Sequence, residues 1–154
     1  MSVVIPDSAR ALIETFPLGF AATVTPDGMP SLSPKGTFLV LDDTTIAFAE
    51  IRSPNTMKNL ATQPHMEVNF IDIWKRKGVR VFGKVDVINR EDESFADLLP
   101  LWATPFPTLA PRINAIVKVD VERIKPMTTP PYDDGISEED MIATYKQKFA
   151  EIYP

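Results

Sequence analysis

The 154-residue chain contains no cysteine and only one histidine, His65. Without cysteine it has no disulfide framework, no thiol nucleophile and no thiolate metal site. A single histidine excludes a site built from several imidazoles of one chain, and it leaves His65 as the only base for a serine hydrolase triad. No nucleophile-elbow motif precedes any serine. We therefore expect no metal, and we interpret His65 as a surface residue.

The chain also lacks a positive charge excess and a long apolar run. It has 16 Lys and Arg residues against 21 Asp and Glu residues, which gives a net charge of -5. No global positive field favours nucleic acid or an anionic membrane. No run approaches the roughly 20 apolar residues of a membrane span, and the N-terminus lacks a signal-peptide pattern. We expect a cytoplasmic protein that binds neither nucleic acid nor membrane.

Hydrophobic residues make up 44% of the chain, which is typical of a globular protein, and the length predicts one domain over residues 1–154. Apolar runs between turn residues predict about six mainly antiparallel strands, beginning with hairpins over 20–33 and 37–49 and ending with a strand over 115–124. We expect a mainly β (α+β) fold closed into a barrel, because closure removes exposed sheet edges.

Short helices flank these strands. The spacing of Phe95, Leu98, Leu99 and Trp102 predicts one helix over 91–102 with an apolar stripe for the core or a dimer contact. A capping pattern predicts a last helix over about 137–153. The basic loop at 74–78 is interpreted as a solvated hairpin tip.

The segment from Arg52 to Thr56 joins a strand to a helix that runs to about residue 62. Ser53 is suited to cap the helix with its side chain, and Pro54 suits the first helical position. Free backbone N–H groups and the helix dipole make such a start an anion site, to which Arg52 adds a fixed charge. A phosphate fits this pattern, although an ordinary capped helix with a solvated arginine is the simpler interpretation.

Three segments in the same order and spacing resemble the flavin-binding split-barrel superfamily named after pyridoxamine 5'-phosphate oxidase. They lie at 19–28, 33–36 and 48–60, and the resemblance covers about residues 10–125. It implies a six-stranded antiparallel split barrel that forms a homodimer and binds FMN at the interface. The deazaflavin F420 is an alternative cofactor, because related barrels accept it.

The resemblance also implies roles for individual residues. Those expected to bind the FMN phosphate are Arg52, Ser53, Asn55 and Thr56. Those expected to run along the isoalloxazine are Ser33, Pro34, Lys35, Gly36 and Thr37, with Lys35 as a cation near the reduced ring. Glu50 and Lys58 are expected beside the pocket, and Trp102 is a candidate stacking partner from the second subunit.

The chain departs from the true pyridoxamine phosphate oxidases at its end. Those enzymes close with an arginine- and histidine-bearing segment that clasps the substrate phosphate, whereas residues 145–154 contain neither residue type. The leading hypothesis is an FMN-dependent oxidoreductase that transfers hydride between flavin and a reduced nucleotide or small organic substrate. A non-catalytic flavin-binding or electron-carrier module is the alternative, and a barrel without cofactor is a third. No catalytic residue or substrate follows from the sequence.

Overall fold

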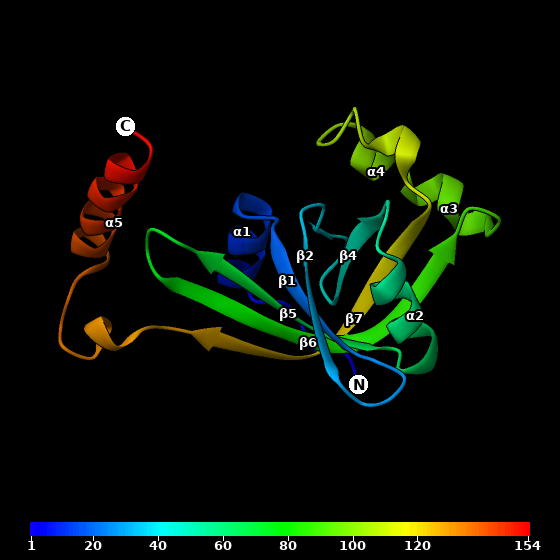
Figure 1. Cartoon of the computed structure of the whole chain (residues 1–154), viewed down its shortest axis with the longest axis horizontal. Helices are drawn as coiled ribbons and strands as arrows, with labels where there is room; N and C mark the ends of the chain where they lie inside the picture. The colour runs from blue at the N-terminus through cyan, green and yellow to red at the C-terminus, as the bar shows by residue number, and fades with distance from the viewer.

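The computed structural model describes residues 1–154. Seven strands are accompanied by five α-helices and two 3-10 turns (Figure 1). In chain order the elements are α1 (Asp7–Thr15), β1 (Gly19–Val24), β2 (Pro30–Lys35), β3 (Leu39–Val40), β4 (Thr45–Glu50), α2 (Pro54–Thr62), β5 (His65–Asp72), β6 (Lys77–Asn89), α3 (Glu93–Leu98), α4 (Pro100–Ala103), η1 (Ala110–Arg112), β7 (Ala115–Met127), η2 (Pro130–Tyr132) and α5 (Glu138–Ile152).

All strands form one sheet in the order β2-β1-β5-β6-β7-β4-β3, and every neighbouring pair is antiparallel. The mainly antiparallel, split-barrel fold class is thereby confirmed. The prediction of about six strands is one too low, and the expected closure is wrong, because β2 and β3 remain as edges. Both edges are protected in other ways. β3 has only two residues, and Pro30 and Pro34 remove backbone donors from β2.

The main core fills the concave side of the sheet with aromatic and branched side chains. Phe38 lies 5.3 Å from Phe48 and 4.9 Å from Phe70 between ring centroids, and all three are buried. Helix α1 covers this core and contributes Ile13, which is completely buried. Because β4 is buried along its whole length, it gives the following turn a rigid support.

The helix predicted over 91–102 is divided into α3 and α4 at Pro100. Proline has no N–H to donate back into the preceding turn, so a new short helix begins there. Phe95 and Trp102 nevertheless pack together with Ile113 in a second buried cluster. The predicted apolar stripe is therefore core, as one of its two interpretations stated.

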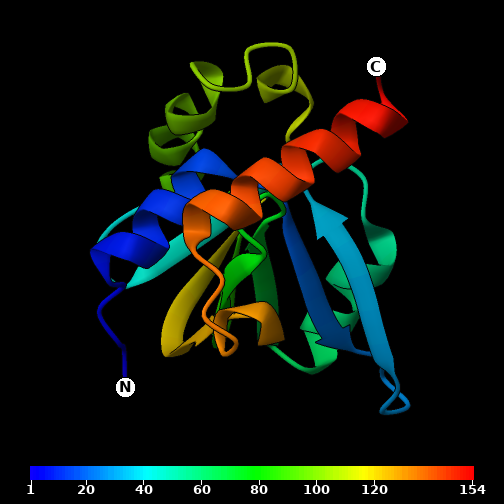
Figure 2. The ribbon, with the colours of Figure 1, turned by 90° about the vertical axis from the view of Figure 1, so that its left-hand side faces the viewer.

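Helix α5 lies at the opposite end of the molecule from α3 and α4 (Figure 1). Figure 2, viewed from that end, shows α5 on the outer surface.

The basic loop at 74–78 is not a free hairpin tip, because it contacts this helix. Trp74 packs edge-on against Phe149 with 5.7 Å between ring centroids, and the Arg76 guanidinium lies 4.6 Å from the centroid of the Tyr145 ring. Lys75 and Lys77 both pair with Glu138, at 3.1 and 3.0 Å. None of the helices is both long and apolar enough to cross a membrane.

Candidate functional site

The inner face of β2 forms one wall of a polar pocket. Period-two alternation places Ser31, Ser33 and Lys35 on the same side of this strand, opposite Thr23, Ala21 and Gly19 of β1. The Lys35 ammonium group donates a hydrogen bond to Ser33 Oγ at 3.0 Å. Burial lowers the pKa of Lys35 below its usual range, and the negative charge of Glu50 opposes this effect.

The turn between β4 and α2 forms the opposite wall. Glu50, the last residue of β4, accepts hydrogen bonds from Ser53 N at 2.6 Å and from Ser53 Oγ at 3.3 Å. The predicted cap is therefore wrong in its chemistry: Ser53 occupies the N-cap position, but its side chain bonds Glu50 and makes no capping bond. As a result, the backbone N–H groups of Asn55 and Thr56 have no partner within the chain.

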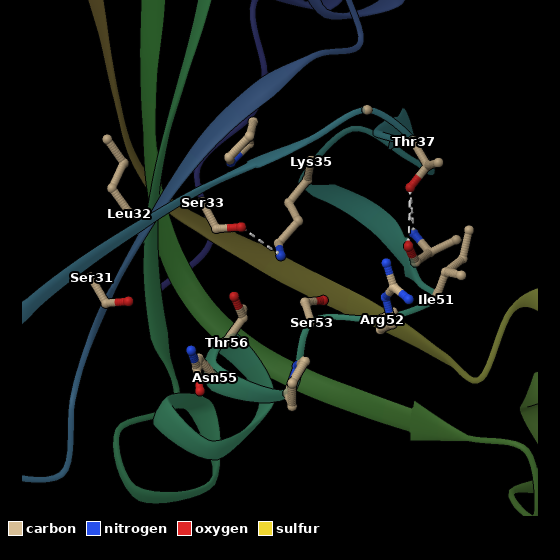
Figure 3. A pocket seen from close by; sticks show the side chains of 14 residues that line it. Ser31, Leu32, Ser33, Lys35, Thr37, Ile51, Arg52, Ser53, Asn55 and Thr56 are labelled. Atoms are coloured by element: carbon tan, nitrogen blue, oxygen red, sulfur yellow. Dashed lines mark hydrogen bonds between the residues drawn. The ribbon is translucent and has the colours of Figure 1, made fainter.

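These two walls enclose a pocket of about 450 Å³ (Figure 3). Lys35 points from β2 into the space in front of Ser53 and Thr56. Nine of the eleven residues that the resemblance suggested line the pocket, namely Ser33, Pro34, Lys35, Gly36, Thr37, Arg52, Ser53, Asn55 and Thr56. Five further lining residues were not predicted, namely Ser31, Leu32, Ala49, Ile51 and Pro54. Strand alternation from Ser33 would have identified Ser31.

The structure does not bring the two remaining candidates into the pocket. Lys58 is exposed on α2 and is not among the lining residues. Trp102 is completely buried, and its indole N–H donates to the Thr37 carbonyl oxygen at 2.8 Å. Its ring therefore has no surface free to stack on a ligand in this conformation. The Thr37 hydroxyl group is also hydrogen-bonded, because it accepts from Ala49 N at 3.0 Å and donates to Ala49 O at 3.1 Å. Trp102 thus helps to hold Thr37, a residue of the pocket wall, in place.

Helix α2 is held in place by a buried residue that the sequence did not single out. Asn59 is 3% exposed, and its side-chain amide donates to Thr23 Oγ1 on β1 at 2.9 Å. This bond joins α2 to the hairpin that carries the opposite wall. The first turn of α2 consequently faces β2.

The electrostatics of the pocket favour an anion. Lys35 and Arg52 supply positive charge, and the free amides of Asn55 and Thr56 lie at the positive end of the α2 dipole.

A second, larger cavity of about 710 Å³ lies between α1, β6 and β7. There Lys75 and Lys77 are already paired with Glu138, so neither lysine is free for an anion.

Comparison with known proteins agrees with this fold. The family model described as pyridoxamine 5'-phosphate oxidase matches residues 5–128. The chain belongs to the pyridoxamine 5'-phosphate oxidase family. No curated protein matches its sequence.

Solved structures of the same fold add detail to the family assignment. HupZ of Group A Streptococcus is 25% identical, with a TM-score of 0.69 over 81% of this chain and 95% of that one. An FMN-binding protein of Syntrophomonas wolfei is 21% identical, with a TM-score of 0.62 over 79% and 85%. An F420 reductase is 22% identical, with a TM-score of 0.60 over 79% and 98%. The structures that share this fold thus include an FMN-binding protein and an F420 reductase.

Replacing Lys35 by methionine should stabilise this protein in the absence of a ligand. Burial disfavours the charged amine and lowers its pKa in the folded protein. The charged amine therefore destabilises the folded state fully at pH values below this lowered pKa, and the destabilisation disappears as the pH rises toward the ordinary pKa of 10.5. We expect K35M to raise Tm by roughly 2–4 °C near pH 7, with the difference shrinking toward pH 10. Calorimetry with the exposed variant K58M as control checks this. A pH-independent change, or a lower Tm, would contradict burial as the cause.

Proposed function

We propose that this protein is an FMN-dependent oxidoreductase that transfers hydride between the flavin and a reduced nucleotide or small organic substrate. The proposal is carried by one observation. Strand β2 and the first turn of α2 face each other across one pocket, which combines two free amides with the charged groups of Arg52 and Lys35. A flavin mononucleotide needs such a combination, because its phosphate is anionic and its ring accumulates negative charge on reduction.

The residues at the α2 end fit a phosphate group. The amides of Asn55 and Thr56 would donate to its oxygens, and Arg52 would add a charge-assisted contact from the exposed side. Ser53 would support these residues rather than bind directly, because both of its donors already reach Glu50. Lys58 stands outside the pocket, so we assign it no contact.

The β2 end suits the ring. FMN, when bound, supplies the hydride chemistry, and the chain supplies orientation and charge. Ser33 holds the Lys35 ammonium group at 3.0 Å, so that its charge is fixed inside the pocket. Thr37 is immobilised by Ala49 and Trp102, which keeps the wall in place beside the ring.

We further propose a homodimer that completes this pocket. The outward face of the β1–β2 hairpin carries Phe20, Val24 and Leu32 on paired strands, exposed by 40%, 40% and 69%. An apolar face of this kind is typical of a protein interface. Leu32 also lines the pocket, so a partner that covers this face would lie beside the cofactor.

A flavin-binding or electron-carrier module without an organic substrate is the second candidate. It is favoured by the position of α5, which is held by Trp74 and Arg76 at the opposite end of the molecule from α2. In this arrangement the C-terminal segment does not cover the pocket. F420 remains the alternative cofactor, because a reductase of that cofactor shares the fold.

The first test is the visible spectrum of the purified protein before and after FMN is added and the excess removed. We expect flavin bands at about one FMN per chain, with the released ligand identified by mass, and subsequent oxidation of NADH or NADPH. A bound flavin that only another protein reduces would support the carrier. Binding of F420 in place of FMN would contradict the FMN assignment, and binding of neither would contradict the cofactor site.

Replacing Arg52 by alanine should weaken FMN selectively. A charge-assisted phosphate contact contributes about 1.5 to 3 kcal/mol, so we expect FMN affinity to fall roughly tenfold or more and riboflavin affinity to stay unchanged. Titration by flavin fluorescence measures both. Arg112→Ala removes an equivalent exposed charge in η1, outside the pocket, and serves as the control. Equal losses for FMN and riboflavin would show that Arg52 does not bind the phosphate.

Replacing Leu32 by glutamate should disrupt the proposed dimer, because it places a charge in the centre of the apolar face. Light scattering after size exclusion is expected to give a dimer for the wild type and a monomer for L32E, with weaker flavin binding. Leu101→Glu adds the same charge at an exposed residue of α4 and should remain dimeric. A wild-type monomer of 17.2 kDa with bound flavin would refute the shared pocket.

A further inference from the structure

The cavity of about 710 Å³ between α1, β6 and β7 shares no lining residue with the pocket beside α2. Its volume lies in the range of small-molecule sites, which is roughly 300–1,000 Å³. Helix α5 begins at this cavity with Glu138, and α5 lies at the opposite end of the molecule from α2 (Figure 1). A ligand bound here would therefore occupy a site separate from the proposed flavin pocket.

The walls of this cavity are mainly apolar. One face of α1 lines it, because the lining residues recur at helical spacings of three and four: Ser8, Ala11, Leu12, Thr15 and Phe16. Strands β6 and β7 add the apolar side chains of Val79, Ile124 and Met127. Leu12, Val79 and Ile124 also pack in the main core, so a ligand would meet side chains that are already held in place.

The charged side chains that line the cavity balance one another. Lys75 and Lys77 both pair with Glu138, at 3.1 and 3.0 Å, and Asp72 is the fourth charged lining residue. Two positive and two negative side chains leave no excess of either sign. Since a charge that leaves water for such a site gains no compensating partner, the cavity favours a neutral ligand.

Asp72 offers this ligand one polar contact. The residue is 9% exposed, and its Oδ1 atom accepts hydrogen bonds from the backbone N–H groups of Trp74 and Lys75, both at 2.9 Å. These two bonds fix the carboxylate where β5 ends. No group of the chain donates a hydrogen bond to the second oxygen, Oδ2, and no cation lies within ion-pair distance of it. A strong acceptor in the cavity wall is therefore open to a donor.

We infer that this cavity is a binding site for a neutral, largely apolar small molecule that carries a hydrogen-bond donor, and that Asp72 accepts from that donor. A hydrogen bond to a carboxylate is charge-assisted and roughly twice as strong as one between neutral groups. A ring-sized hydrocarbon with one hydroxyl group, as in a phenol, satisfies both the apolar walls and Asp72. The inference does not depend on the identity of the cofactor in the other pocket.

Three probes with the same naphthalene body separate these contributions: 2-naphthol, 2-methoxynaphthalene, which lacks the donor, and the anion 2-naphthoate. Equilibrium dialysis measures their affinities on protein loaded with FMN and freed of the excess, or on protein as purified if it binds no FMN. We expect 2-naphthol to bind about tenfold more tightly than 2-methoxynaphthalene, and 2-naphthoate to bind most weakly. Equal affinities for the three probes, or binding of none, would overturn the inference.

Two variants locate the probe. Asp72→Asn keeps an oxygen that accepts from Trp74 and Lys75 but replaces the open acceptor by a donor. We expect D72N to bind 2-naphthol about fivefold or more weakly and 2-methoxynaphthalene unchanged. Ala11 lines the cavity but is exposed on α1, so Ala11→Trp fills the space without entering the core, and both neutral probes should lose about tenfold or more.

Ala103→Trp at an exposed residue of α4 is the matched control and should change neither affinity. Unchanged probe binding in A11W, or an equal loss of both neutral probes in D72N, would overturn the inference. Flavin binding should be the same in all three variants. A wild type that binds 2-naphthol as expected but takes up no flavin would contradict the proposed function alone.

Discussion

The position of the first turn of α2 opposite β2 depends on two hydrogen-bonded anchors. The buried amide of Asn59 bonds Thr23 on β1, and the carboxylate of Glu50 bonds both donors of Ser53. Thr23, Glu50 and Asn59 do not line the pocket, yet these two anchors determine where the free amides of Asn55 and Thr56 point. Since β4 is buried throughout and paired with β7, the turn begins from a support that cannot shift.

The β1–β2 hairpin serves two purposes because of strand alternation. Its inner face presents Ser31, Ser33 and Lys35 to the pocket, and its outer face presents Phe20, Val24 and Leu32 to solvent. One hairpin therefore supplies a polar wall and the apolar surface on which we propose a second copy docks. The prolines of β2 fit the same position, since an edge strand needs no donor on its outer side.

The pocket is locally positive, whereas the molecule as a whole is negative. The chain carries a net charge of -5, but here two cations and the positive end of a helix converge on one buried carboxylate. Desolvation of Lys35 opposes folding, and Ser33 and Glu50 only partly compensate for it. A bound anion would balance the excess positive charge of the pocket. Residues that destabilise the folded protein without a ligand are typical of binding sites, because such residues serve function rather than stability.

The sequence by itself determined the strand order along the chain, the antiparallel class and the helix that begins at Pro54, because turn residues and apolar periodicity are local signals. It also identified nine residues that share one pocket, by resemblance to family motifs, and the helix start at Pro54 indicated an anion site beside Arg52 independently of that resemblance. Only the tertiary structure decided that the sheet stays open, that Trp102 is core and that Ser53 bonds Glu50 instead of capping its helix. The open sheet and the buried Trp102 depend on packing between segments that are distant in sequence. The bond between Ser53 and Glu50 depends on competition between two hydrogen-bond partners for one side chain, which a capping preference does not resolve.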